Sequence, residues 1–341
     1  MSSDAATGSG GPGRRWRSPA LHLALGALVP VWAAPGTVAG QESVTRLATA
    51  CAGASEALSS PCLETVLALQ AAQGIVGLAA SGGAELSGSS STLGKRYGGT
   101  PRFGLAGRVG FVDASMPGVL GPATGPAPDA GAFAPSIQAT AAVGLFQGFS
   151  PAPTVGGLLS LDVLATFSWV DLPGDRGFRD SPAGLGLGVR VGVFRESFTL
   201  PGITLSATRR WMGKVRLGGD GEEGTRGDLD LTVTSFRASA GKELLAFGFL
   251  GGVGWDRYRS ATTLVVLPGG AGGPEGAAEE GAFTSDRLLF FAGAGYTFLV
   301  AQISAELGWA RGWDEVPGRS PGGFDPGSGS LFGRLAFRLT L

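Results

Sequence analysis

Histidine is the residue that this sequence lacks most clearly, since its 341 residues contain only one, His22. His22 lies in an N-terminal stretch that we expect to be removed, so the mature chain would contain none. Histidine is the commonest general base in catalysis, and zinc sites draw on histidine and cysteine. Cysteine is scarce too, with only two residues in the sequence. We therefore expect no enzyme activity, no catalytic residue, no metal site and no cofactor.

The sequence also lacks an excess of either charge. Its 26 Lys and Arg residues against 27 Asp and Glu residues give a net charge of −1. That balance offers no basic surface of the kind that nucleic acid binding requires. Beyond the N-terminal stretch we find no run of about 18 apolar residues, so we expect no helix to span a membrane. Glycine is abundant instead, with 61 residues.

Residues 1–40 have the organisation of a secretory signal peptide. Three arginines lie between positions 14 and 17, an apolar run covers 20–34, and the small residues Ala39 and Gly40 follow as a cleavage site. The apolar run is shorter than the ~20 residues that a membrane-spanning helix needs. The sequence therefore predicts an exported protein.

A helical segment is expected at 41–73. This stretch is rich in Ala, Leu and Glu, and Ser59–Pro61 reads as a turn between two short helices. Nearby thiols usually pair in the oxidising compartment that an exported chain enters. We therefore expect a disulfide between Cys51 and Cys62 that joins the two helices. The hairpin is expected on the periplasmic side, either as a periplasmic segment or as a plug at the mouth of the barrel.

From about residue 74 onward the sequence alternates with a period of two. In the last segment, Leu331, Leu335 and Leu339 share one phase, whereas Arg334 and Arg338 share the other. Alternate side chains of a strand lie on opposite faces. Apolar-out, polar-in segments of about ten residues are typical of transmembrane β-barrels. The sequence therefore predicts an all-β fold, an antiparallel barrel preceded by a short helical hairpin.

We count twelve expected strands, with ten as the alternative because the first two have a diluted pattern. The expected strands cover 74–82, 90–97, 102–112, 136–149, 156–170, 184–197, 202–217, 228–240, 244–261, 284–297, 299–312 and 330–341. Short connections, such as 241–243, alternate with long ones. Barrels of this kind have short periplasmic turns and long extracellular loops. The C-terminus is therefore expected in the periplasm.

Four tryptophans support this arrangement. Trp169, Trp211, Trp255 and Trp309 lie on four successive outward-running strands, at a similar distance past the preceding short turn and in the apolar phase. Aromatic residues collect at membrane interfaces because the ring is apolar while its N–H needs water. We expect these four side chains to form an aromatic girdle on the extracellular side.

Residues 74–341 resemble the bacterial outer-membrane β-barrel superfamily. The resemblance rests on the period-two alternation, the four tryptophans and the apolar series that ends at Leu341. Members usually end in an aromatic residue, and Leu341 departs from that pattern. The resemblance implies a place in the bacterial outer membrane, contact with its lipid and lipopolysaccharide, and insertion by the barrel-assembly machinery. It indicates no single transporter family and no oligomeric state.

Charged residues on the expected strands fall mainly in the phase opposite to the apolar face. A basic residue that faces hydrocarbon costs about 2–4 kcal/mol near the midplane, so we place this set in the lumen. Its members are Arg108, Asp162, Arg190, Arg210, Lys214, Arg216, Asp228, Asp230, Asp256, Glu306, Arg334 and Arg338.

Symmetric hairpins would bring oppositely charged members of this set together. The expected lumen pairs are Asp162 with Arg190, Lys214 and Arg216 with Asp230 and Asp228, and Glu306 with Arg334. Three other arginines share the apolar phase close to a tryptophan, where a long side chain can reach the headgroups. These are Arg209, Arg257 and Arg311.

Our first functional hypothesis is a channel or porin for small polar solutes, with a basic lumen that favours anions. One alternative is a structural or surface-interaction barrel whose lumen is closed by ion pairs. The other is a transporter of apolar molecules, against which the charged lumen argues. The acidic long loops are either a solvated, hydrophilic surface or a site that binds divalent cations beside lipopolysaccharide phosphates.

Overall fold

The computed structural model describes residues 37–53, 56–81, 96–97, 100–117, 129–149, 158–194, 196, 200–218, 224–267, 277–312 and 324–340. Two helices come first, α1 (Thr37–Ala52) and α2 (Glu56–Ser81). Thirteen strands follow, with one 3₁₀ turn at Gly174–Arg176. They are β1 (Arg96–Tyr97), β2 (Thr100–Pro101), β3 (Phe103–Pro117), β4 (Asp129–Phe146), β5 (Ser160–Val170), β6 (Ala183–Phe194), β7 (Gly202–Met212), β8 (Val215–Gly218), β9 (Gly224–Leu244), β10 (Phe247–Leu267), β11 (Ala277–Phe298), β12 (Ala301–Ala310) and β13 (Ser330–Thr340).

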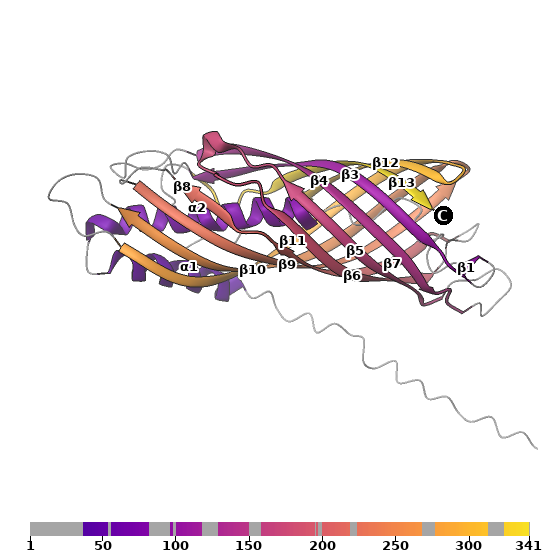
Figure 1. Ribbon diagram of the computed structural model, residues 1–341, viewed down its shortest axis with the longest axis horizontal. Helices are drawn as coiled ribbons and strands as arrows, with labels where there is room; N and C mark the ends of the chain where they lie inside the picture. The colour runs from indigo at the N-terminus through magenta and orange to yellow at the C-terminus, as the bar shows by residue number, and fades with distance from the viewer. Residues whose placement is uncertain are drawn as a thin grey trace, which may run out of the picture. The chain divides into compact units, whose positions relative to one another are not determined.

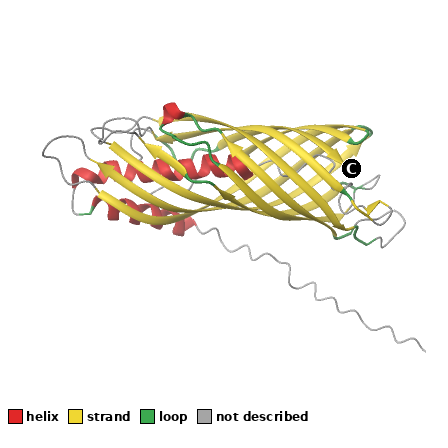
Figure 2. Ribbon diagram, in the orientation of Figure 1, coloured by secondary structure: helices red, strands yellow, loops and turns green. Residues whose placement is uncertain are grey.

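Ten of these strands close into one antiparallel barrel (Figures 1 and 2). Neighbouring strands pair in the order β3-β4-β5-β6-β7-β9-β10-β11-β12-β13, and β13 pairs with β3 to close the wall. The extra strand β8 follows β7 and pairs with the same partner, β9. The expected all-β barrel with an N-terminal helical segment is confirmed, with ten wall strands rather than twelve.

The two weakest strand predictions account for the wrong count. Residues 74–81 belong to helix α2, so the expected strand at 74–82 is wrong. Of the expected strand at 90–97, only Arg96–Tyr97 lies among the described residues, where it forms β1 and pairs with β2 outside the barrel sheet. The wall therefore begins at Phe103.

The wall follows the period-two pattern of the sequence. On β6, Leu185, Leu187 and Val189 are exposed on the outer surface, whereas Gly184 and Gly186 are buried on the inner face. On β13, Leu335 is 58% exposed while its neighbour Arg334 is 6% exposed. A closed barrel has no unpaired edge strand, and its outer surface carries an apolar band, as a bilayer requires.

The two ends of the barrel have different connections. At one end, called here the short-turn end, two-residue turns join β9 to β10 at Leu245–Ala246 and β11 to β12 at Leu299–Val300. The C-terminus also lies there, since Thr340 pairs with Gly104 at the start of β3. The expected turn at 241–243 is wrong, because β9 continues to Leu244 and Leu245 turns the chain with a φ of 61°. The opposite end, with longer connections, is called the long-loop end.

Helices α1 and α2 lie at the long-loop end, where α2 enters the barrel (Figure 1). Helix α1 packs on the inner face of β11, and a Cβ at Gly281 would lie 2.8 Å from Leu47. The sequence predicts the hairpin on the periplasmic side, at the end where the C-terminus lies. That placement is wrong, because the helices occupy the other end.

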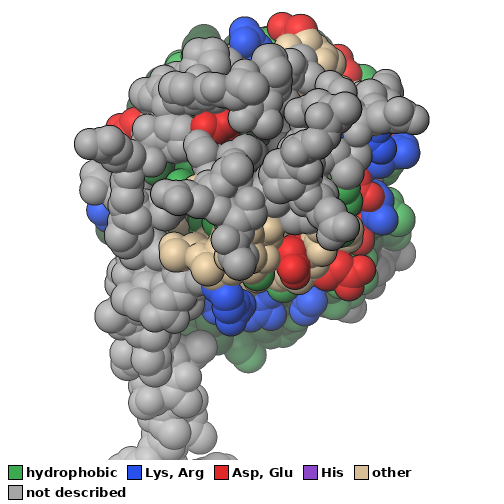
Figure 3. Space-filling model, turned by 90° about the vertical axis from the view of Figure 1, so that its left-hand side faces the viewer, with side chains coloured by type: hydrophobic (Ala, Val, Ile, Leu, Met, Phe, Trp, Pro, Cys, Tyr) green, Lys and Arg blue, Asp and Glu red, His purple; other side chains and the backbone are tan. Residues whose placement is uncertain are grey.

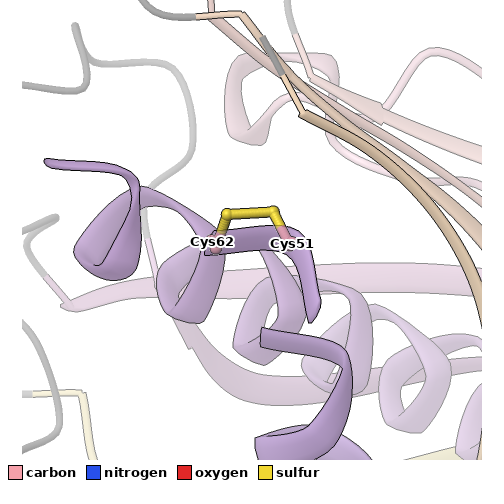
Figure 4. Close-up of a disulfide and its surroundings, with 2 residues drawn as sticks. All are labelled: Cys51 and Cys62. Atoms are coloured by element: carbon pink, nitrogen blue, oxygen red, sulfur yellow. A yellow bond between two sulfur atoms is a disulfide. The ribbon is translucent and has the colours of Figure 1, made fainter. Parts of the chain in front are cut away.

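The expected disulfide is confirmed. Cys51 and Cys62 are bonded across the α1–α2 junction, with their Cα atoms 5.8 Å apart (Figure 4). The predicted signal peptide falls mostly on residues 1–36, which lie outside the described residues. Helix α1 begins at Thr37, ahead of the cleavage sites expected at Ala39 and Gly40.

The expectation that no later segment is long and apolar enough to cross a membrane is also wrong. The segment Cys62–Ser81 of α2 has that length and composition, and 89% of it is buried. Here the apolar surface of the helix is covered by the barrel wall. The long-loop half of the barrel therefore has a hydrophobic interior.

Candidate functional site

The most elaborate polar site of the interior surrounds the C-terminal end of α2. Asp256 on β10 is fully buried and forms a two-contact ion pair with Arg237 on β9, at 2.5 and 3.0 Å. Ser81, the last residue of α2, donates its hydroxyl to the same carboxylate at 2.5 Å. The Tyr258 hydroxyl donates to it at 3.1 Å. We call Ser81, Arg237, Asp256 and Tyr258, together with Gln138 and Arg334, the collar.

The collar also satisfies the last carbonyls of the helix. Arg334 donates to the Leu78 carbonyl at 2.8 Å, and Gln138 donates to the Ala79 carbonyl at 2.7 Å. The carbonyls at a helix C-terminus have no partner within the helix, and the helix dipole makes that end partly negative. Cationic donors in a dry interior are therefore well suited to hold it. The collar fixes where α2 ends, about halfway along the barrel.

Further up the helix, Gln73 is the main polar contact with the wall. Its amide nitrogen donates to the Ser260 hydroxyl at 2.8 Å, and its amide oxygen accepts from the Ser285 hydroxyl at 2.6 Å. One turn later, Gly77 lies against Tyr258, and a Cβ at Gly77 would be 2.5 Å from the ring. These contacts fix both the rotation of the helix relative to the wall and its depth in the barrel.

Apolar side chains line the wall around the rest of α2. Leu229, Leu231 and Val233 of β9 are buried on its inner face, and Leu264 of β10 is buried beside them. They form one core with the apolar residues of α2. A buried leucine contributes roughly 1.5–3 kcal/mol relative to an exposed one. This contact holds the helix in the long-loop half.

The inner face of the wall is charged from the collar to the short-turn end. Among the described residues, seven buried arginines and three buried acids lie on the barrel strands. The arginines are Arg108, Arg190, Arg210, Arg237, Arg287, Arg334 and Arg338, and the acids are Asp162, Asp256 and Glu306. Counting +7 and −3, this set carries a net charge of +4.

Two of the expected pairs share the inner face in the expected register. Arg190 and Asp162 are direct neighbours on β6 and β5, and their side chains form an ion pair at 3.0 Å. Glu306 on β12 lies directly opposite Arg334 on β13. Arg210 and Arg108 are buried on the same inner face, and Arg108 donates to the Thr140 hydroxyl at 2.6 Å. Arg338 is buried on β13.

Four residues that we placed in the lumen lie outside instead: Lys214, Arg216, Asp228 and Asp230. Lys214, Arg216 and Asp230 are exposed and Asp228 is partly exposed, while their neighbours Val215 and Leu229 are buried. Lys214 does approach Asp228, at 3.7 Å, but on the outer surface.

Two physical causes explain this error. The strand is interrupted after Met212, and the interruption reverses which phase faces inward on β8. On β9 the apolar phase of 229–233 faces inward because α2 is there. The apolar face of a strand therefore does not mark the lipid side wherever a helix fills the lumen.

Because the wrong phase was assigned to the lumen, two arginines of the interior, Arg237 and Arg287, were not predicted. Arg237 shares its phase with Leu229 and Leu231, which we assigned to lipid. A usable signal was the polar series Ser235-x-Arg237-x-Ser239, which contradicts a lipid-facing assignment in the second half of that strand. Arg287 follows Ser285 in the same way on β11.

The four tryptophans point outward. Trp211 and Trp309 are exposed, at 46% and 44%, and Trp169 and Trp255 are partly exposed. Arg209 lies over the Trp211 ring at 5.7 Å, and Arg257 lies over the Trp255 ring at 4.9 Å. Their common depth in a membrane stays a prediction.

At the long-loop end, charged side chains of both signs lie on the wall (Figure 3). Arg216 donates two hydrogen bonds to Asp180, at 2.6 and 2.8 Å. These hydrogen bonds hold the pKa of the Asp180 carboxyl below its ordinary value.

No family model matches this sequence, and no curated protein matches it. Solved structures of similar shape are barrels with low sequence identity. The translocator domain of the autotransporter NalP from Neisseria meningitidis aligns at 12% identity and a TM-score of 0.42, over 81% of this chain and 97% of that chain. The transport unit of the autotransporter AIDA-I from Escherichia coli aligns at 9% identity and a TM-score of 0.39, over 79% and 97%. The attachment invasion locus protein Ail of Yersinia pestis aligns at 8% identity and a TM-score of 0.29, over 71% and 99%.

The environment of the barrel follows from its two surfaces. The strands close completely, the outer face of the wall carries an apolar band, and buried charged side chains line the inner face. In water this arrangement would expose its hydrophobic face, whereas in a bilayer every surface meets a matching medium. The chain is an antiparallel β-barrel with the two surfaces of a transmembrane barrel.

Proposed function

We propose that this protein is a closed outer-membrane barrel that holds its own N-terminal helices at the cell surface, where the helices and the long loops form an interaction surface. The observation that carries the proposal is the seating of α2 inside the barrel. The helix is covered by apolar wall residues along its length, and its last turn is held by Arg334, Gln138 and Ser81 contacts. We propose no catalytic role.

The direction of the chain supports a display role. Helix α1 lies at the long-loop end, α2 ends inside at Ser81, and the wall starts at Phe103 at the short-turn end. Long loops are extracellular in barrels of this class. The N-terminal side of the helical segment would therefore face the outside of the cell, although the C-terminus faces the periplasm.

The size of the lumen also favours a closed state. Side chains alone nearly fill a barrel of about eight strands, and a helix with its side chains is about 10–12 Å wide. Ten strands around a helix leave little room for a permanent aqueous pore. The basic short-turn half would then hold the end of α2 rather than conduct ions.

Labelling of intact cells tests the display role. Arg46 is exposed on α1, and Leu245 is exposed at the short-turn end. We expect Arg46→Cys to react with a membrane-impermeant maleimide added outside intact cells. Leu245→Cys should react only after the outer membrane is permeabilised. The reverse pattern would contradict the proposal.

A gated channel for small anions is the second candidate, favoured by the net positive charge of the short-turn half. It requires α2 to leave the lumen. In planar bilayers this candidate predicts anion-selective openings, and Arg338→Gln should lower the preference for chloride over potassium. The matched change Arg259→Gln, on the outer surface, should leave it unaltered. Absence of openings in the intact protein at all voltages would support the closed barrel and exclude the channel.

A further inference from the structure

We infer that the outer face of β7, β9 and β10, around Arg209, Arg257 and Arg259, is a binding surface for the phosphorylated headgroup of lipopolysaccharide. The proposal concerns the outside of the wall. It therefore does not depend on whether the lumen is open or closed. It does require the long-loop end to lie outside the cell.

The three arginines form a compact group across neighbouring strands. Arg209 is paired with Thr234, and Thr234 is paired with Arg257, so these residues form one row across the sheet. In the next row toward the long-loop end, Trp211 is paired with Thr232 and Thr232 with Arg259. Adjacent strands are about 4.8 Å apart, so one phosphate group could contact two of the guanidinium groups and a threonine hydroxyl.

The position of the group marks the edge of the hydrocarbon layer. In the row on the short-turn side of Arg257, the rings of Phe236 and Trp255 are in tilted contact, with their centroids 5.5 Å apart. Beyond Arg259 the outer face carries Asp230 and Asp228. The outer surface thus changes from aromatic to basic to acidic within a few residues. Lipid phosphates lie at the level of such a basic row, between the acyl chains and the aqueous phase.

The arginines are held in place and carry charge that the surrounding wall does not neutralise. Asp286 binds Arg257 through two contacts, at 2.8 and 3.0 Å, while the Arg257 guanidinium lies over Trp255. Neither Arg209 nor Arg259 has an ion-pair partner within the described part of the chain. The two rows therefore present three guanidinium groups against one carboxylate. Arginine binds phosphate through paired N–H donors, and the acidic residues beyond would disfavour a second anion there.

Native mass spectrometry of the purified protein with lipid A bisphosphate tests the inference. We expect wild-type protein to retain the lipid, and the triple variant Arg209→Gln, Arg257→Gln, Arg259→Gln to bind it at least about tenfold more weakly, the factor that corresponds to one strong contact. A control variant, Arg46→Gln, Arg176→Gln, Arg179→Gln, removes the same charge from the same end. It should bind as wild type does.

Two further lipids complete the test. Lipid A without phosphates should bind wild-type protein and the triple variant equally weakly, because the arginines read the phosphate. Phosphatidylglycerol binding as strongly as lipid A bisphosphate would overturn the assignment to lipopolysaccharide. Equal retention of lipid A bisphosphate by the triple variant and by the control would overturn the site itself. The heat-dependent gel mobility of each variant shows that the barrel has folded.

Discussion

The two halves of the barrel interior have opposite chemistry. In the long-loop half, Leu229, Leu231 and Leu264 pack against a helix, whereas in the short-turn half Arg108, Arg190 and Arg338 line the wall. The outer face is apolar beside the short-turn half, whereas on β9 and β10 it becomes charged beyond Trp255, beside the helix-filled half. The interior of this barrel is therefore apolar where another part of its own chain fills the lumen, and charged below the end of that helix.

The collar lies at the border between the halves and joins them. Its acid, Asp256, binds an arginine of the wall and the last residue of α2 together. Charges in a dry interior are stable only when they are paired and hydrogen-bonded. The following predictions test this division, from the largest effect to the smallest.

The buried ion pair of the collar should be the most sensitive contact. Asp256→Ala leaves Arg237 buried without its partner, which should lower the free energy of unfolding by about 3–5 kcal/mol. The matched change Asp286→Ala removes the partner of Arg257 on the outer surface, where the Arg257 side chain is 35% exposed. It should cost less than about 1 kcal/mol. Urea unfolding of the refolded barrels measures both, and equal losses would contradict the buried collar.

In the long-loop half, α2 and the wall lie too close together to accept an added methyl group without a loss of stability. Gly77→Ala introduces a Cβ into the Tyr258 ring, and such overpacking costs about 1–3 kcal/mol. Alanine is the better helix former by up to ~1 kcal/mol, so the clash would have to exceed that gain. The control is Gly131→Ala on β4, where a Cβ would meet no atom within 4 Å. Stabilisation by Gly77→Ala would mean that α2 does not touch Tyr258.

The outward placement of Lys214 predicts a small effect. Its contact with Asp228 spans 3.7 Å between exposed side chains, so Lys214→Ala should change the free energy of unfolding by less than about 1 kcal/mol. Had Lys214 lain in the lumen beside Asp228, as the sequence pattern suggested, the change would leave a buried acid unpaired. A loss of several kcal/mol would restore that interpretation.

The smallest effect concerns pH at the long-loop end. Arg216 lowers the pKa of Asp180 in the folded protein, so this pair contributes stability above the ordinary pKa of an aspartate. The contribution is lost as the pH falls through the lowered pKa, because the proton then binds the folded state too. The stability difference between wild type and Asp180→Asn should shrink over that acidic range. A difference that is constant with pH would exclude the pair as its cause.

Much of the wall could be predicted from the sequence, because the outward phase is set by lipid alone. The register of Glu306 with Arg334 and of Asp162 with Arg190 followed from hairpin geometry. The interior was harder, because an inward residue faces whatever fills the lumen. Residues 229–233 are apolar because they pack on α2, and nothing within 229–233 itself distinguishes that contact from lipid; only the polar series that follows at 235–239 does. Helix α2 continues to Ser81 rather than ending at 73, because residues 74–81, which the sequence pattern assigns to a first strand, are helical.

The most direct test of the account is a cross-link between α2 and the wall. The Gln73 amide and the Ser285 hydroxyl are 2.6 Å apart inside the barrel, so Gln73→Cys with Ser285→Cys should form a disulfide in the folded protein. The pair Gln73→Cys with Ile303→Cys should not, because Ile303 is 60% exposed on the outer face. Gel mobility before and after protease cleavage between α2 and the wall would show each bond. A failure of the first pair to cross-link in folded barrels would contradict a helix-filled lumen.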